Sequence, residues 1–260
     1  MIPIGPEIPR DAAGLRAALA GVLAPLGLGS DAVATAGDFP ALSRLDACLD
    51  GAKFARHPRP EAPAVDEGGF FAREVDVRAR PASFEGFEFQ AALHAEDAVF
   101  GFFRDPSGGV MLRLVRATTG MFEVTVPRSE LERALHTLAS RAAEKQGAEI
   151  KSVALELTPH GPRKLAVRAV VTAKAMLFST GITLTGVIEI TDTLHIRLRG
   201  LACHGDGMIG NLAAGFLRPR FADIEAREIP MGRALGGIAL RSVEISGGPE
   251  LKIRASFGGE

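Results

Sequence analysis

Apolar and polar residues alternate over much of this chain of 260 residues, and no other feature constrains its fold as strongly. The longest example runs from Leu165 to Ala175, where every second residue is apolar. Successive side chains of a strand point to opposite faces, so this alternation predicts a strand with one buried face. Turn-forming residues such as DPSGG (105–109) separate the runs at short intervals, which indicates an antiparallel meander.

The alternating runs predict a fold class of the α+β type, in which long curved antiparallel sheets wrap around helices. In the first run, Phe71, Val75 and Val77 are expected on one face. Strands are predicted near residues 70–77, 87–93, 99–103, 110–114, 121–126, 153–157, 165–175, 182–190, 194–198, 238–245 and 251–257.

Three helices are predicted before the last third of the chain. Asp11 is the expected N-cap of the first, which Pro25 and Gly27 end. Residues 38–52 are predicted to form a second, short helix because their leucines are three and four residues apart. Residues 129–147 form the third, a surface helix that covers apolar sheet, with Ser129 and Glu132 as a capping box and Gly147 as its end.

The stretch from Cys203 to Phe221 reads as a fourth, central helix between strands. Asp206 is its candidate N-cap, apolar residues follow at helical spacing, and Pro219 ends the pattern. An apolar helix in this position is expected to pack on the concave face of the sheet. The expected organisation is 1–65 (helices and a Pro-rich linker at 57–63), 66–150 and 151–260, where the last two could also form one continuous domain.

Composition narrows the classes of function. The formal net charge of −1 argues against a general nucleic-acid binder, which needs a surplus of Lys and Arg. The local basic concentration, Arg197, Arg199, Arg218 and Arg220, offers Arg218 and Arg220 as partners for an anionic head group. With no signal peptide and no span of about 18 apolar residues, a cytoplasmic location is expected, or the cell envelope if a leader has been removed.

The sequence contains few residues that point to chemistry. No His pair has metal-ligand spacing and the two cysteines are far apart, so neither a metal nor a cofactor is expected. Cys203, His204 and Asp206 could form a nucleophile–base group, although adjacent residues usually point apart. Gly205, Gly207 and Gly210 match the spacing of a dinucleotide-binding loop, but the preceding strands are expected to be antiparallel rather than parallel.

The C-terminal half resembles the tubular lipid-binding (TULIP) superfamily, specifically the small bacterial LmeA-like lipid-binding proteins. The resembling segments are LAVRAVVTAKA, GITLTGVIEI, LHIRLRGL, MIGNLAAGFLRP and the C-terminal IPMGRALGGIALRSVEISGGPELKIRASF. The resemblance implies a long antiparallel sheet around a helix, with an apolar tunnel for acyl chains.

The leading expectation is therefore a non-enzymatic protein that binds, and could transfer, a lipid or fatty-acid-like ligand between sheet and helix, with transient contact to a membrane surface. Two alternatives stay open: a structural or protein-interaction module without a ligand, and a hydrolase-type enzyme that uses Cys203, His204 and Asp206. The sequence leaves the oligomeric state open. The expected cavity lining is Val167, Val171, Ile182, Leu184, Ile188, Leu212, Phe216 and Leu240.

Overall fold

The computed structural model of the chain describes residues 2–55, 65–144, 147–175, 178–207, 210, 215, 221–231 and 239–259. They divide into two compact units. The first comprises Met1–Val124, Gly232–Ser242 and Arg254–Glu260, and the second comprises Thr125–Met231 and Val243–Ile253. Both are dominated by β-sheet with few helices, which confirms the α+β class.

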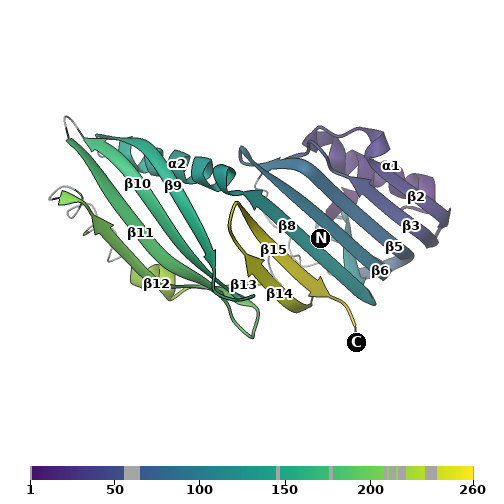
Figure 1. The fold of residues 1–260 in the computed structure, drawn as a ribbon. Coiled ribbons are helices and arrows are strands. Elements are labelled where there is room, and N and C mark those ends of the chain that lie inside the picture. The colour runs from purple at the N-terminus through teal and green to yellow at the C-terminus, as the bar shows by residue number, and fades with distance from the viewer. Residues whose placement is uncertain are drawn as a thin grey trace. The chain divides into compact units, whose positions relative to one another are not determined.

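The first unit contains most of a ten-stranded sheet with the order β14-β15-β8-β6-β5-β3-β2 (Figure 1). β7 pairs with β6 and β1, and β4 pairs with β5. The elements are β1 (Ile2–Gly5), α1 (Ala12–Leu23), the 3₁₀ turns η1 (Ala24–Leu26) and η2 (Ser30–Ala32), β2 (Val33–Asp38), β3 (Ala41–Cys48), β4 (Lys53–Phe54), β5 (Val65–Phe84), β6 (Phe87–Arg104), β7 (Val110–Arg116), β8 (Thr119–Pro127), β14 (Leu240–Ser246) and β15 (Glu250–Phe257).

The first helix begins and ends where the sequence predicts. The Asp11 carboxylate accepts a hydrogen bond from the Gly14 N–H at 2.7 Å, which satisfies one free donor of the first turn of α1. Leu15 is fully buried and anchors the helix in the core. The helical stretch ends through η1 at Gly27, whose φ of 87° is a conformation that glycine adopts without strain.

The prediction of a second short helix at residues 38–52 is wrong, because this segment forms β3. β3 pairs antiparallel with β2 and parallel with β5. Relative to β2, Leu42 pairs with Gly37 and Arg44 with Ala36, so Ser43 is an extra residue on β3. The bulge places Leu42 and Leu45 on the same buried face although they are three residues apart, a spacing that imitates a helix.

The same change of phase occurs in β5 and β6. Their buried residues change from the pair Ala72 and Ala98 to the pair Val75 and Ala95, with two exposed residues between them in each strand. On β6 the backbone φ of Asp97, within this exposed pair, is 49°. Simple alternation predicts Phe71 on the same face as Val75, but this prediction is wrong. Phe70 and Ala72 lie on the buried face of Val75 instead. The pairing of β5 with β6 has no register shift at this level, so the two strands change phase together.

The second unit contains a five-stranded sheet with the order β13-β12-β11-β10-β9. Its pairings are antiparallel, and β10 pairs with β11 over its whole length. Its helix, α2 (Arg128–Glu144), lies beside β9 (Figure 1). The strands are β9 (Ala148–Pro159), β10 (Lys164–Ala175), β11 (Phe178–Ile190), β12 (His195–Gly205) and β13 (Glu228–Pro230).

The position of α2 corrects two expectations. The helix begins at Arg128, so Ser129 lies inside it rather than at its N-cap. The Glu132 carboxylate accepts a hydrogen bond from the Leu155 N–H at 2.8 Å instead of closing a capping box. β9 is the edge strand of its sheet, so α2 satisfies an edge donor there. Leu138 of its apolar stripe is 62% exposed, so part of that stripe does not cover sheet.

Two Leu→Ala substitutions test the different packing of the helices. Leu15→Ala removes a fully buried side chain and should lower the free energy of unfolding by about 2–5 kcal/mol. Leu138→Ala on the exposed side of α2 should change it by less than about 0.5 kcal/mol. Urea unfolding followed by circular dichroism measures both, and equal losses would contradict the packing of α1.

Candidate functional site

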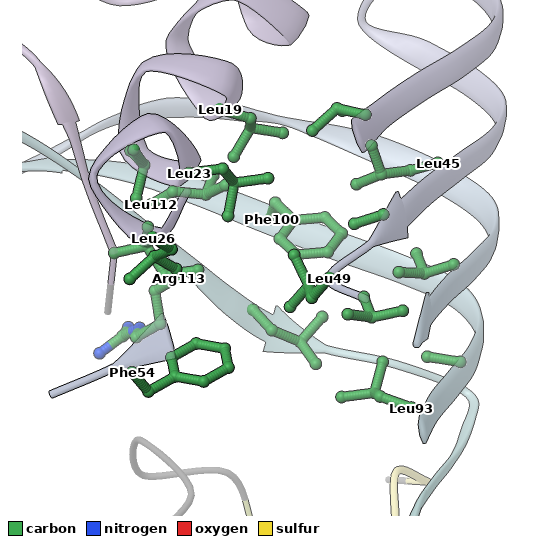
Figure 2. A pocket seen from close by; sticks show the side chains of 18 residues that line it. Leu19, Leu23, Leu26, Leu45, Leu49, Phe54, Leu93, Phe100, Leu112 and Arg113 are labelled. Atoms are coloured by element: carbon green, nitrogen blue, oxygen red, sulfur yellow. The ribbon is translucent and has the colours of Figure 1, made fainter. Parts of the chain in front are cut away.

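An apolar cavity of about 420 Å³ lies between α1 and the sheet of the first unit, partly open to solvent (Figure 2). All but one of the 18 residues that line it are apolar. They are Ile2, Leu19, Val22, Leu23, Leu26, Val33, Leu45, Ala47, Leu49, Phe54, Val75, Val77, Leu93, Ala95, Phe100, Leu112, Arg113 and Leu114.

The helix forms one wall of this cavity through side chains of one face. Figure 2 shows Leu19 and Leu23 of α1 and Leu26 of η1 pointing toward the sheet. Leu15, one turn before Leu19, is fully buried, whereas Leu19 and Leu23 keep part of their surface exposed. The helix is therefore packed tightly on the sheet near its N-terminal end, and space opens toward its C-terminal end.

The sheet forms the opposite wall, and small residues there contribute to the open space. Ala47 on β3 and Ala95 on β6 lie among larger residues such as Leu45, Val77 and Leu93. Leu42 and Phe102, farther along the same apolar face, are almost completely buried. The lining residues Phe100 and Leu112 lie next to Phe102, so the cavity adjoins a densely packed part of the core.

Arg113 is the single charged residue among the described residues that line the cavity, but its neighbours Leu112 and Leu114 point to the cavity side, so its side chain points to the opposite face of the sheet. Its guanidinium carbon lies 4.4 Å from the centre of the Phe103 ring, a cation–π contact. Gly101 is opposite Arg113 on β6, and a Cβ atom at Gly101 would lie 2.7 Å from the Phe103 ring. Glycine at this position therefore gives the ring the room to lie beneath the guanidinium.

The opposite face of the same sheet is charged. A shallow depression of about 540 Å³ there contains Arg44, which contacts Asp46 at 2.9 Å and Asp76 at 3.0 Å. Asp46 is the main cause of the raised pKa of Arg44. His94 Nδ1 lies 2.8 Å from Asp76. These side chains are 39–48% exposed, so the group is a solvated ion-pair network of the kind that contributes little binding energy.

None of the predicted lining residues that the structure describes is part of the apolar cavity, but five of them share one face of the second sheet. In the register of β10 and β11, Val171 is opposite Ile182, Val167 opposite Gly186, and Ala169 opposite Leu184. Ile188 is opposite Leu165 on the same face. All five predicted residues are half-buried.

The remaining predicted residues are placed differently. Leu240 belongs to the first unit and packs against its core. Leu212, Phe216, Arg218 and Arg220 lie outside the described residues, as does most of the central helix.

The neighbouring arginines of the predicted basic group have carboxylate partners. Arg197 forms an ion pair with Glu228, and Arg199 lies 3.5 Å from Glu189. Lys164 also contacts Glu189 at 3.0 Å and is the main cause of the lowered pKa of that carboxyl group. These side chains form ion pairs between neighbouring strands of the second sheet.

The proposed nucleophile–base group is not assembled around Cys203. Cys203 is 1% exposed, whereas the next residue, His204, is exposed, and adjacent residues of a strand point to opposite faces. The Asp206 backbone pairs with Gly181 and Thr180. β12 pairs antiparallel with β11, so the parallel strand that a dinucleotide-binding loop requires does not precede Gly205.

Within the described residues, no group of three or more His, Cys, Asp or Glu side chains is arranged to hold a metal ion. None of the helices in the described part combines the length and hydrophobicity needed to cross a bilayer. No protein-family model, curated protein or solved structure matches the chain.

Sequence reasoning missed the N-terminal cavity because it interpreted β3 as a helix. The apolar face of the first helix, with Leu19, Val22 and Leu23, was predictable from its spacing. Because residues 38–52 were expected to be helical, no strand was predicted next to the apolar face of this first helix, and no cavity was expected there. The signal that could have found the site is the apolar pair Leu45 and Ala47, which alternates with the polar residues Arg44 and Asp46.

The two cysteines should differ in reactivity in the folded protein. Cys48 is partly exposed and contacts Arg78 and Asp50, whereas Cys203 is buried. Iodoacetamide at neutral pH should therefore label Cys48 faster, as peptide mapping by mass spectrometry would show. Equally fast labelling of Cys203 without denaturant would contradict its burial and support the enzyme hypothesis.

Proposed function

We propose that this protein binds a small apolar molecule, such as a lipid acyl chain, in the cavity between α1 and the sheet of the first unit. The observation that carries the proposal is the lining, in which 17 apolar residues and Arg113 surround about 420 Å³ of space. Ligand pockets of about 300–1,000 Å³ with apolar walls and few polar groups are typical of small-molecule sites. The volume is at the lower end of that range, which favours one acyl chain over a two-chain lipid.

The energetics of this site favour a hydrocarbon ligand. Each CH₂ group that leaves water for an apolar environment gains about 0.8 kcal/mol. The described side chains that point into the cavity are apolar, so none of them could form a hydrogen bond with a strongly polar ligand. A polar molecule in this space would lose hydrogen bonds to water without replacing them. Binding without catalysis fits these walls better than a reaction does.

A second site in the C-terminal unit is part of the same proposal. The half-buried residues Val167, Val171, Ile182, Leu184 and Ile188 share one face of its sheet. The resemblance of this half to TULIP proteins supports an acyl-chain site on that face. The rival view, a structural module without a ligand, requires both apolar faces to be filled or covered by the protein itself.

Native mass spectrometry of the protein purified from cells should detect a bound small molecule. Extraction with organic solvent should then release an apolar compound, identified by its mass. Repeated isolation of bare protein that also fails to take up Nile red, a neutral apolar dye, would overturn the proposal and favour the structural module.

A cavity-filling substitution locates the site. Ala47→Phe places a ring among the lining residues and should weaken Nile red binding more than tenfold, because displacing two CH₂ equivalents costs about 1.6 kcal/mol. Ala34→Phe is the matched control, since Ala34 is exposed on the outer face of the neighbouring strand and pairs with Asp46. Both variants should stay folded by circular dichroism; equal binding by the two would place the site elsewhere.

A further inference from the structure

We infer that the protein forms a dimer in which β2 pairs antiparallel with β2 of a second copy of this chain. The inference goes beyond the proposed ligand and does not depend on it. It rests on the outer edge of β2, where the described structure provides no hydrogen-bond partner. A strand edge with free N–H and C=O groups is a template for pairing with another chain.

β2 is the last strand of its sheet, and only one of its two edges is occupied. β3 pairs with it regularly from Val33 to Ala36, and the irregular step lies at Gly37. No other described strand pairs with β2, and no described side chain forms a hydrogen bond with residues 33–38. The outer edge of β2 therefore presents backbone donors and acceptors to solvent.

The side chains of β2 do not protect this edge. Proteins usually blunt an exposed edge with lysine, proline, a covering helix or a very short strand. Residues 33–37 are instead VATAG, which are small and uncharged, and the single charged residue of β2 is Asp38 at its end. Ala34 and Ala36 are exposed, so another strand can approach without displacing a long side chain.

Other edges in the described structure are protected. On β9 the Leu155 N–H donates to the Glu132 carboxylate at 2.8 Å. On β12, beyond its pairing with the short β13, the Leu201 N–H donates to the Glu225 carboxylate at 2.7 Å. β14 carries an exposed arginine and an exposed glutamate. β2 has neither kind of protection among the residues that the structure describes.

A second copy of β2 fits this edge because the strand is complementary to itself. With Thr35 opposite Thr35 of the second copy, Ala34 lies opposite Ala36 of that copy in each of two symmetric rows. On β3, Asp46 pairs with Ala34. Arg44 pairs with Ala36. Each row therefore has an aspartate at one end and an arginine at the other, with two alanines between them, so the pairing opposes no like charges.

The dimer is expected to be weak because its interface is small. Interfaces that bury less than about 1,200 Å² are typical of transient complexes, and pairing through one strand of six residues belongs to this class. A Kd on the order of 100 µM is expected. Because Val33 of β2 lines the cavity, pairing would also fix the outermost strand of the cavity wall.

Sedimentation equilibrium of the full chain at about 10 to 500 µM tests the inference. Ala34→Lys/Ala36→Lys places lysine opposite lysine in both rows and should raise the Kd more than about tenfold. Ala34→Lys/Ala36→Glu places lysine opposite glutamate in both rows and should keep the Kd within about threefold of the unmodified protein. The two variants differ in one residue only.

Ala13→Lys/Ala17→Lys is the matched control, since both alanines are exposed on α1 rather than on β2, and the Kd of this variant should not change. Circular dichroism should show that all variants are folded. A protein that stays monomeric at about 500 µM overturns the inference. Equal Kd values for the two β2 variants also overturn it, because only the pairing of position 34 with position 36 distinguishes them.

Discussion

The structure of the first unit depends on a mismatch of length between its helix and its longest strands. A helix of 12 residues such as α1 is about 18 Å long, whereas the 20 residues of β5 span about 60 Å. One side of the sheet is apolar and must be covered, but α1 can cover only part of it. The part nearest Leu15 forms a dense core, and the hollow lies beneath the C-terminal half of α1, where Leu19 and Leu23 line it.

The apolar face of the sheet changes phase in the middle of three strands, and the cavity lining includes residues on both sides of this change. In β3, β5 and β6 the buried set changes phase at the same level, and three pairs of exposed residues mark it: Ser43–Arg44, Arg73–Glu74 and Glu96–Asp97. Arg44 and Glu74 of these pairs contact each other at 3.6 Å across the outer face. Because the phase changes together in β3, β5 and β6, their pairing register is kept and the apolar face stays continuous at this level.

The sequence predicts the parts of this fold that depend on local chemistry. The Asp11 cap and the Gly27 end define α1, and alternation locates β10 over its whole length. Prediction from the sequence fails where contacts between distant segments determine the structure. A bulge at Ser43 gives Leu42 and Leu45 the spacing of a helix. The Glu132 carboxylate accepts a hydrogen bond from the edge strand β9 and therefore does not close the expected capping box. The predicted boundary at residue 65 also separates β3 from β5, which are neighbours in one sheet.

The two faces of the first sheet differ in what they could bind. On the outer face, charges occur in opposite pairs such as Arg44 with Asp76, and water screens them, so they favour no particular external partner. The face beneath α1 differs because apolar side chains line it and the helix covers part of it. An apolar ligand on that face would leave water without losing hydrogen bonds, which is the condition under which burial of hydrocarbon favours binding. The same sheet therefore has one face on which ion pairs compensate the charges and one face on which hydrophobic burial can supply binding energy.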